Sequence, residues 1–212
     1  MTSQASGHLS WGRVLEPDEV EAQLAPLVAS CPLSAVKVGM VGSAAVALKL
    51  AELLTKIDAP VVFDPVLDTS GGDPLYLEKS LEDLWPLMKA STVVTPNLAE
   101  AESLSGMAVR NLESMIQAAK ALVQRGVPAV LVTGGHLDDR PSDVLYDGVS
   151  EHHYVSERLA ASPRGTGCVL STALACALAE TGDLSLAVSR AKKYVTHRIA
   201  RHYQLSDGGA YM

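Results

Sequence analysis

The chain has 212 residues, 48% of them hydrophobic and 19% charged, which is enough for one large domain with a buried core, and we expect a single domain over residues 1–212. Its formal net charge of −7 excludes a broad basic surface for nucleic acid or an anionic membrane, and no apolar run reaches the roughly 20 residues that span a bilayer. Cys31, Cys168 and Cys176 form neither an even set nor a paired zinc-binding spacing, and with no N-terminal signal sequence they favour a cytoplasmic protein with reduced thiols.

Short apolar runs alternate with longer amphipathic segments along the chain, which predicts strands and helices in turn. In the first half the expected elements are, in order, a helix at 16–28, a strand at 35–39, a helix at 43–56, a strand at 60–63, a helix at 77–88 interrupted near Pro86, and a strand at 92–95. The second half gives, in order, helices at 97–104 and 112–124, a strand at 130–132, an antiparallel strand pair at 144–146 and 152–155, and helices at 165–180 and 184–202. Ser43 is a candidate N-cap for the second helix, and Asp147 with Gly148 joins the strand pair.

The runs at 61–63 and 130–132 are apolar without interruption, which is typical of strands covered on both faces. Because such strands alternate with helices, the sequence predicts an α/β fold of three layers, with a mostly parallel sheet between two layers of helices. The polar-bounded pair at 144–146 and 152–155 is expected near the edge of this sheet. No internal repeat, linker or low-complexity segment divides the chain.

The most informative motif is the turn formed by Gly165, Thr166, Gly167 and Cys168, which leads directly into a helix of small residues. Two glycines allow a sharp turn whose N–H groups point outward at the positive end of the helix dipole, an arrangement that binds anions. Cys168 in the first helical turn would have its thiol pKa controlled by that position and by a bound phosphate. The alternative is a plain glycine turn before a core helix, with Cys168 as a small buried thiol that packs the helix start.

Six polar or glycine residues follow the ends of predicted strands: Asp64, Asn97, Glu100, Thr133, Gly134 and Gly135. Ligands of open α/β sheets bind outside the carboxyl ends of the strands, so we expect these residues to meet in one crevice. In the alternative interpretation Asp64 simply ends a strand, and Asn97 and Glu100 form an ordinary cap at the start of a solvent-facing helix.

The segments 63–74, 93–100, 129–136, 165–168 and 191–195 occur in an order that resembles the hydroxymethylpyrimidine and phosphomethylpyrimidine kinases of thiamine biosynthesis, members of the ribokinase-like group. The resemblance runs from about Gln4 to the C-terminal helix. It is specific, because most ribokinase relatives carry Asp at the position of Cys168. It implies a ribokinase-like fold and ATP-dependent phosphorylation of 4-amino-5-hydroxymethyl-2-methylpyrimidine and of its monophosphate.

The resemblance also implies a role for each motif. Gly165, Thr166 and Gly167 would form the anion hole for the transferred phosphoryl group, and Cys168 would face the acceptor hydroxymethyl group. The nucleotide and its Mg²⁺ would be held by residues at the strand ends, with Glu100 reaching Mg²⁺ through water: Asp64, Asn97, Glu100, Thr133 and Gly135. The pyrimidine would lie against Gln4, Met40 and Val66, where the Gln4 amide can both donate and accept hydrogen bonds.

Cysteine at position 168 suits an enzyme that uses two acceptors. An alcohol must lose a proton before it attacks phosphorus, whereas a monophosphate is already an oxyanion and would be repelled by a fixed carboxylate. We therefore expect a neutral or partly ionised Cys168 thiol that assists the alcohol and tolerates the monophosphate.

The sequence departs from the family at three places. The match lacks the glycine-rich strand, helix and strand with which the relatives begin, so we expect an uncovered apolar face and an exposed sheet edge, and a homodimer that would cover such a face. Thr133 stands where the nearest relatives often have Lys. The segment 162–164 reads Ser-Pro-Arg where relatives usually have Asn-Thr-His.

Two other functions stay open on the sequence alone. A pyridoxal-type kinase on the same scaffold is compatible with Thr133 and with the turn that ends in Cys168. A non-catalytic nucleotide- or pyrimidine-binding protein would account for the missing N-terminal unit.

Overall fold

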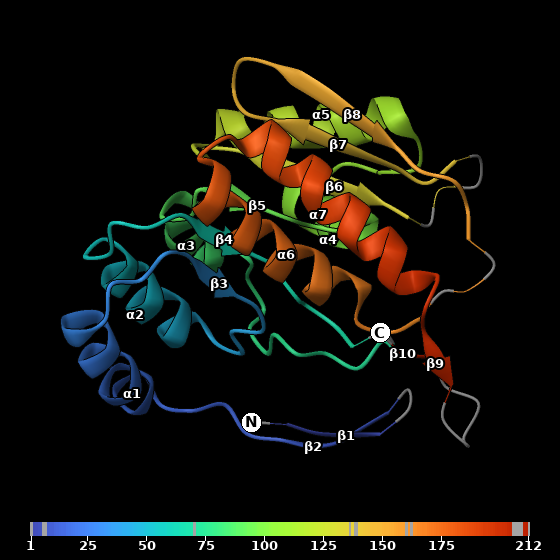
Figure 1. The fold of residues 1–212 in the computed structure, drawn as a ribbon. Helices are drawn as coiled ribbons and strands as arrows, with labels where there is room; N and C mark the ends of the chain where they lie inside the picture. Colours follow the sequence, from blue (N-terminus) through green and yellow to red (C-terminus); the bar gives the residue numbers. More distant parts are fainter. Residues whose placement is uncertain are drawn as a thin grey trace.

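A six-stranded sheet lies at the centre of the molecule, with helices on both of its faces (Figure 1). The structure is a computed structural model of the chain and describes residues 2–5, 8–69, 71–135, 137, 140–159, 161, 163–204 and 210–211. The side chains of residues 4, 5, 8 and 9 are outside that description. Within the described residues, no helix combines the length and the apolar character needed to cross a membrane.

The strands of the sheet lie side by side in the same order as they occur in the chain. The parallel strands are β3 (Val36–Val38), β4 (Val61–Phe63), β5 (Val93–Val94) and β6 (Val130–Gly134). The two antiparallel strands are β7 (Ser142–Tyr146) and β8 (Glu151–Val155). The predicted sheet, mostly parallel with an antiparallel pair at one edge, is confirmed.

Helices cover the sheet as two separate layers (Figure 1). One layer consists of α6 (Thr166–Thr181) and α7 (Leu184–Ile199). The other consists of α2 (Ala44–Leu54), α3 (Trp85–Lys89), α4 (Leu98–Ser105) and α5 (Leu112–Gln124). Along β4, Val61 and Phe63 pack in the core of the second layer, whereas Val62 packs with α6 and α7. This burial on both faces explains the uninterrupted apolar run and confirms the three-layer prediction.

Local signals determine where several helices begin. The Ser43 side chain accepts the Val46 N–H at 3.4 Å, so Ser43 is the N-cap of α2 as predicted. The first helix, α1 (Pro17–Ser30), has proline in its first turn and packs beside α2. Asn111 caps α5, which covers the predicted residues 112–124. These starts follow from capping side chains and fixed proline geometry, both readable from sequence.

The helix predicted at 77–88 is largely wrong. The structure has only a short 3₁₀ turn, η1 (Glu82–Leu84), followed by the five-residue helix α3. The Leu77 N–H donates to the Gly42 carbonyl at 3.2 Å, a contact across 35 positions of sequence. Pro86 lies in the first turn of α3, where its missing N–H costs no helical hydrogen bond.

Residues 2–4 belong to a hairpin outside the six-stranded sheet. β1 (Thr2–Ala5) pairs antiparallel with β2 (His8–Gly12), and Figure 1 shows this hairpin below the sheet. β2 supplies the backbone partners that a sheet neighbour would otherwise supply. A second small pair, β9 (Tyr203–Gln204) and β10 (Ala210–Tyr211), lies near the start of α6, because Arg164 N–H donates to the Ala210 carbonyl.

Candidate active site

The carboxyl ends of the parallel strands meet the start of α6. The Asp64 N–H, directly after β4, donates to the Val38 carbonyl at the end of β3. The Thr133 N–H on β6 donates to the Pro96 carbonyl, and Asn97 forms a parallel bridge with Thr133. Ser171 on α6 donates its hydroxyl hydrogen to Asp64 Oδ2 at 3.1 Å. The structure thus brings together strand-end residues that the sequence predicted to share a crevice.

The glycine turn has the shape that anion binding requires. Gly165 has φ +86°, which favours glycine, and α6 begins at Thr166 with no capping side chain on its first N–H groups. A Cβ added at Gly165 or Gly167 would meet nothing within 4 Å, so the space beside the turn is open. Uncapped N–H groups at the start of a 16-residue helix can receive an anion.

Cys168 occupies the third position of α6 and is exposed in the crevice. Partial burial of its sulfur raises the thiol pKa, and the negative charge of Asp64 and a hydrogen bond to it raise the pKa further. Lys37 acts in the opposite direction and lowers the pKa, but the net change is upward. The Cys168 thiol is therefore protonated at neutral pH despite its place at a helix N-terminus. Of the two states expected from sequence, neutral or partly ionised, the raised pKa favours the neutral thiol.

Asp64 is the centre of a buried polar cluster that the sequence interpretation did not anticipate. Its carboxylate receives the Ser171 hydroxyl and lies 3.3 Å from Lys37 Nζ. Neither Ser171 nor Lys37 was among the predicted site residues. The available signal for Lys37 was a lysine between two valines in a short apolar strand, where a charge needs a partner.

Glu100 acts as a helix-capping residue, as one of the two interpretations of its motif predicted. It forms a capping box with Asn97, in which the Asn97 N–H donates to Glu100 Oε2 at 2.8 Å and the Glu100 N–H donates to Asn97 Oδ1 at 3.0 Å. Asn97 and Ala99 are exposed, so the helix start faces solvent as expected, but the Glu100 side chain itself is only 7% exposed. Burial, aided by the charges of Asp64 and Asp68, raises its pKa to about 7 against opposing backbone hydrogen bonds from Asn97 and Leu67.

The end of β6 is fixed by an ion pair that the sequence interpretation also missed. The Gly134 N–H donates to Asp143 Oδ1 at 3.0 Å, and Asp143 pairs with Lys192 of α7. A Cβ at Gly134 would lie 2.2 Å from the Ser142 carbonyl oxygen, so only glycine fits. At Gly135 an added Cβ would meet nothing within 4 Å, so this side of the crevice is open.

Of the three residues predicted to contact the pyrimidine, the structure describes the side chains of two, Met40 and Val66. Met40 follows β3 and is 39% exposed, and Val66 donates its N–H to the Asp64 carbonyl at 2.8 Å. Gly39, which precedes Met40, and Val66 line the same small cavity. The side chain of Gln4 lies outside the described residues, as do His136 and Ser162.

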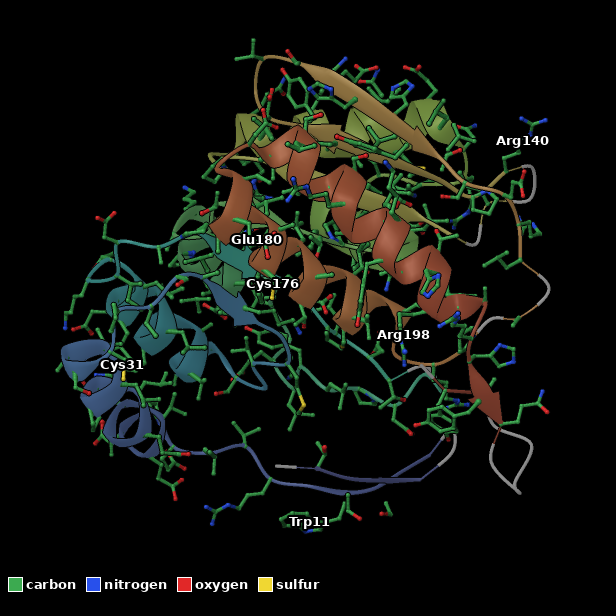
Figure 2. All side chains as sticks on the ribbon, viewed as in Figure 1. Trp11, Cys31, Arg140, Cys176, Glu180 and Arg198 are labelled. Carbon is green, nitrogen blue, oxygen red and sulfur yellow. The ribbon has the colours of Figure 1, made fainter. Side chains whose placement is uncertain are left out.

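A separate groove of about 650 Å³ runs along α6 and α7. It meets the crevice at Cys168 and continues past Thr172 and Cys176 to Glu180; Figure 2 labels the last two. Glu180 pairs there with Arg190 at 3.3 Å. Most of the residues that line this groove are apolar or small.

Comparisons with known proteins agree with this arrangement. The family model for phosphomethylpyrimidine kinase matches residues 1–211. The hydroxymethylpyrimidine/phosphomethylpyrimidine kinase of Streptomyces coelicolor is 38% identical over 210 residues, which cover 98% of this chain and 78% of that protein.

Two solved structures extend the similarity to the fold. The phosphomethylpyrimidine kinase of Clostridium difficile is 30% identical with a TM-score of 0.80, over 93% of this chain and 83% of that one. An ADP complex of Bacillus subtilis pyridoxal kinase is 30% identical with a TM-score of 0.85, over 93% of this chain and 76% of that one. The similarity covers nearly the whole chain at the level of motif, sequence and fold, and the chain belongs to the phosphomethylpyrimidine kinase family.

Proposed function

We propose that this protein transfers the γ-phosphoryl group of ATP first to 4-amino-5-hydroxymethyl-2-methylpyrimidine and then to the resulting monophosphate. The observation that carries the proposal is the open glycine turn at the start of α6, with a neutral Cys168 thiol that lies beside the buried Asp64 carboxylate. Phosphoryl transfer needs this combination of an anion site and a proton acceptor at one point.

In the first transfer, the acceptor alcohol must lose its proton as its oxygen bonds to the γ-phosphorus. Cys168 receives that proton on sulfur while its own thiol proton passes to the neighbouring Asp64 carboxylate, whose negative charge acts on the thiol. The bond between the γ-phosphorus and its bridging oxygen breaks, and ADP leaves with the electron pair. Ser171 keeps Asp64 oriented toward the thiol through its hydroxyl donor.

The transferred phosphoryl group lies against the start of α6 in this proposal. The N–H groups of Thr166, Gly167 and Cys168 are the donors that α6 leaves uncapped there. They stabilise charge on the equatorial oxygens without having to reorganise, which is the main electrostatic contribution expected from the protein.

The nucleotide phosphates lie along the ends of β5 and β6, near Asn97, Glu100, Thr133 and Gly135. Among the described residues, no three acidic, histidine or cysteine side chains are placed to hold a metal ion directly. The buried Glu100, whose pKa is raised partly by Asp64 and Asp68, nevertheless fits a cation that keeps its water shell, as Mg²⁺ does. Bound Mg²⁺ would neutralise phosphate charge during the transfer.

Pyridoxal is a second candidate acceptor. The Bacillus subtilis pyridoxal kinase has the same fold over 93% of this chain. Pyridoxal also carries a hydroxymethyl group on a planar nitrogen heterocycle, so the same thiol and anion site could serve it.

The test is a coupled assay of ADP release with the pyrimidine alcohol, its monophosphate and pyridoxal offered separately, with products identified by mass. We expect release with both pyrimidines and products one and two phosphoryl groups heavier than the alcohol. ADP release with pyridoxal alone would favour the second candidate. Binding of ATP without ADP release on any acceptor would refute the catalytic proposal and favour a binding protein.

We further propose that the protein is a homodimer. The support is the apolar groove along α6 and α7, together with Trp11, which is 54% exposed on β2. Light scattering should give twice the monomer mass of 22.3 kDa, and a monomer at micromolar concentration would refute the proposal.

A further inference from the structure

Lys37 lies close to both the Asp64 carboxylate and Gly39. Its ammonium is 3.3 Å from Asp64 Oδ2, and its charge reaches Cys168, where it lowers the thiol pKa. On the other side it lies over Gly39, next to Met40, which is predicted to contact the pyrimidine. In the proposed function, the group of the acceptor that is phosphorylated would bind beside this ammonium.

The chain makes room for Lys37 at a specific residue. A Cβ at Gly39 would lie 2.5 Å from Lys37 Nζ, so any larger residue would displace the ammonium. The φ of Gly39 is not in the left-handed region, so the backbone itself does not require glycine here. Gly39 is therefore explained by the ammonium that lies against it.

The Lys37 ammonium can form further hydrogen bonds beyond its contact with Asp64. Among the described residues its one ionic partner is Asp64, although an ammonium has three N–H donors. Its side chain is 22% exposed, so it can contact a ligand in the crevice without leaving Asp64. Asp64, Asp68 and Glu100 make this region negative, which repels a phosphorylated acceptor unless a cation compensates.

We propose that Lys37 binds the phosphate of the monophosphate acceptor and so determines whether the enzyme can perform its second transfer. This inference rests on the proposed function. In the second transfer an oxygen of the acceptor's phosphate bonds to the γ-phosphorus, the bond to the bridging oxygen breaks, and ADP leaves with the electron pair. Lys37 keeps all its protons and lowers the repulsion between the two phosphates.

The alcohol acceptor needs a different interaction at the same site. It carries no charge before the transfer, so it gains little from an ammonium and depends on Cys168 for proton removal. Lys37 and Cys168 therefore serve different acceptors, although their side chains face the same Asp64 carboxylate.

The experiment compares kcat/KM for the alcohol and the monophosphate in four variants. Lys37→Met should lower kcat/KM for the monophosphate about 10- to 100-fold more than for the alcohol, the range of one charge-assisted hydrogen bond. Lys37→Arg keeps the charge and should retain most of the wild-type ratio. Gly39→Ala should shift the ratio in the same direction as Lys37→Met by displacing a flexible side-chain end, with little change in Tm. Lys56→Met removes an exposed lysine paired only with Glu52 among the described residues, and serves as the control with an unchanged ratio.

Two results would overturn the proposal. Equal losses on both acceptors in Lys37→Met would mean that the lysine only neutralises Asp64. A larger loss on the alcohol would mean that it serves the proton transfer instead. Both results require a wild type that phosphorylates the two acceptors, whereas a wild type inactive on both refutes the proposed function, so the two failures are distinguishable.

Discussion

Replacing Glu100 by Gln tests whether ionisation of this buried carboxylate lowers the free energy of unfolding. Glu100 is 7% exposed, and burial, with the charges of Asp64 and Asp68, raises its pKa from 4.5 to about 7. A difference of that size corresponds to about 3 kcal/mol of lost folding stability when the group is fully ionised. In Glu100→Gln the amide oxygen can still accept the Asn97 N–H, so the helix cap survives.

The pH dependence follows from the direction of the pKa change. The folded protein holds the Glu100 proton more tightly than the unfolded chain, so the contribution to stability is present below the unfolded pKa of 4.5. It is lost as pH rises through the folded value of about 7. Relative to wild type, Glu100→Gln should therefore become more stable by about 2 to 3 kcal/mol between pH 5 and pH 8.

The assay is urea unfolding of both proteins at pH 5, 6, 7 and 8 without divalent cations, with free energies of unfolding extrapolated to water. Glu102→Gln on the same helix is the matched control. Arg110 lowers the pKa of Glu102, so this carboxylate is ionised in both states and the difference from wild type should be constant over this pH range. A constant difference for Glu100→Gln as well would refute the burial argument.

Three further predictions concern other described residues. Cys168→Ala should lower kcat/KM for the alcohol about 10²- to 10⁴-fold and for the monophosphate far less, because only the alcohol needs proton removal; equal losses would contradict this division. Asp143→Asn should destabilise the protein by about 3 kcal/mol in urea unfolding, because Lys192 is left buried without its counter-charge, and adding Lys192→Met should restore part of the loss. Tyr76→Phe should raise the free energy of unfolding by up to about 1 kcal/mol, since among the described residues the buried Tyr76 hydroxyl has no hydrogen-bond partner; a loss of that size would show that the hydroxyl is satisfied.

Elements with strong local signals could be predicted from sequence. Helix α5 has the predicted bounds because Asn111 caps it and its apolar positions repeat at helical spacing. The β7–β8 pair was found through Asp147, whose side chain accepts the N–H groups of Val149 and Ser150 and stabilises the turn. In each case the residues that determine the structure lie within a few positions of one another.

The missed features depend on partners far away in sequence. The segment at Leu77 is not helical, and its N–H donates to Gly42, 35 positions away in sequence. The raised pKa of Glu100 results from burial in the fold and from the charges of Asp64 and Asp68, which lie more than 30 positions away in sequence. Lys37 looks like an ordinary strand residue until the fold places it at Asp64. The motif resemblance indicated which strand ends and which turn to consider. The contacts among the charged groups around Asp64 could be seen only in the three-dimensional structure.

The hydrogen bond from Ser171 to Asp64 joins residues 107 positions apart, and this separation has a consequence for refolding. Helical segments separate the parallel strands β3 to β6 in sequence, so neighbouring strands can pair only when a long loop closes. Such non-local contacts form slowly. The polar cluster around Asp64 needs β3, β4 and α6 together, so it can form only after most of the loop-closure entropy has been lost. In a refolding experiment, helical circular dichroism should return first, and the ability to bind nucleotide should return with the slowest phase.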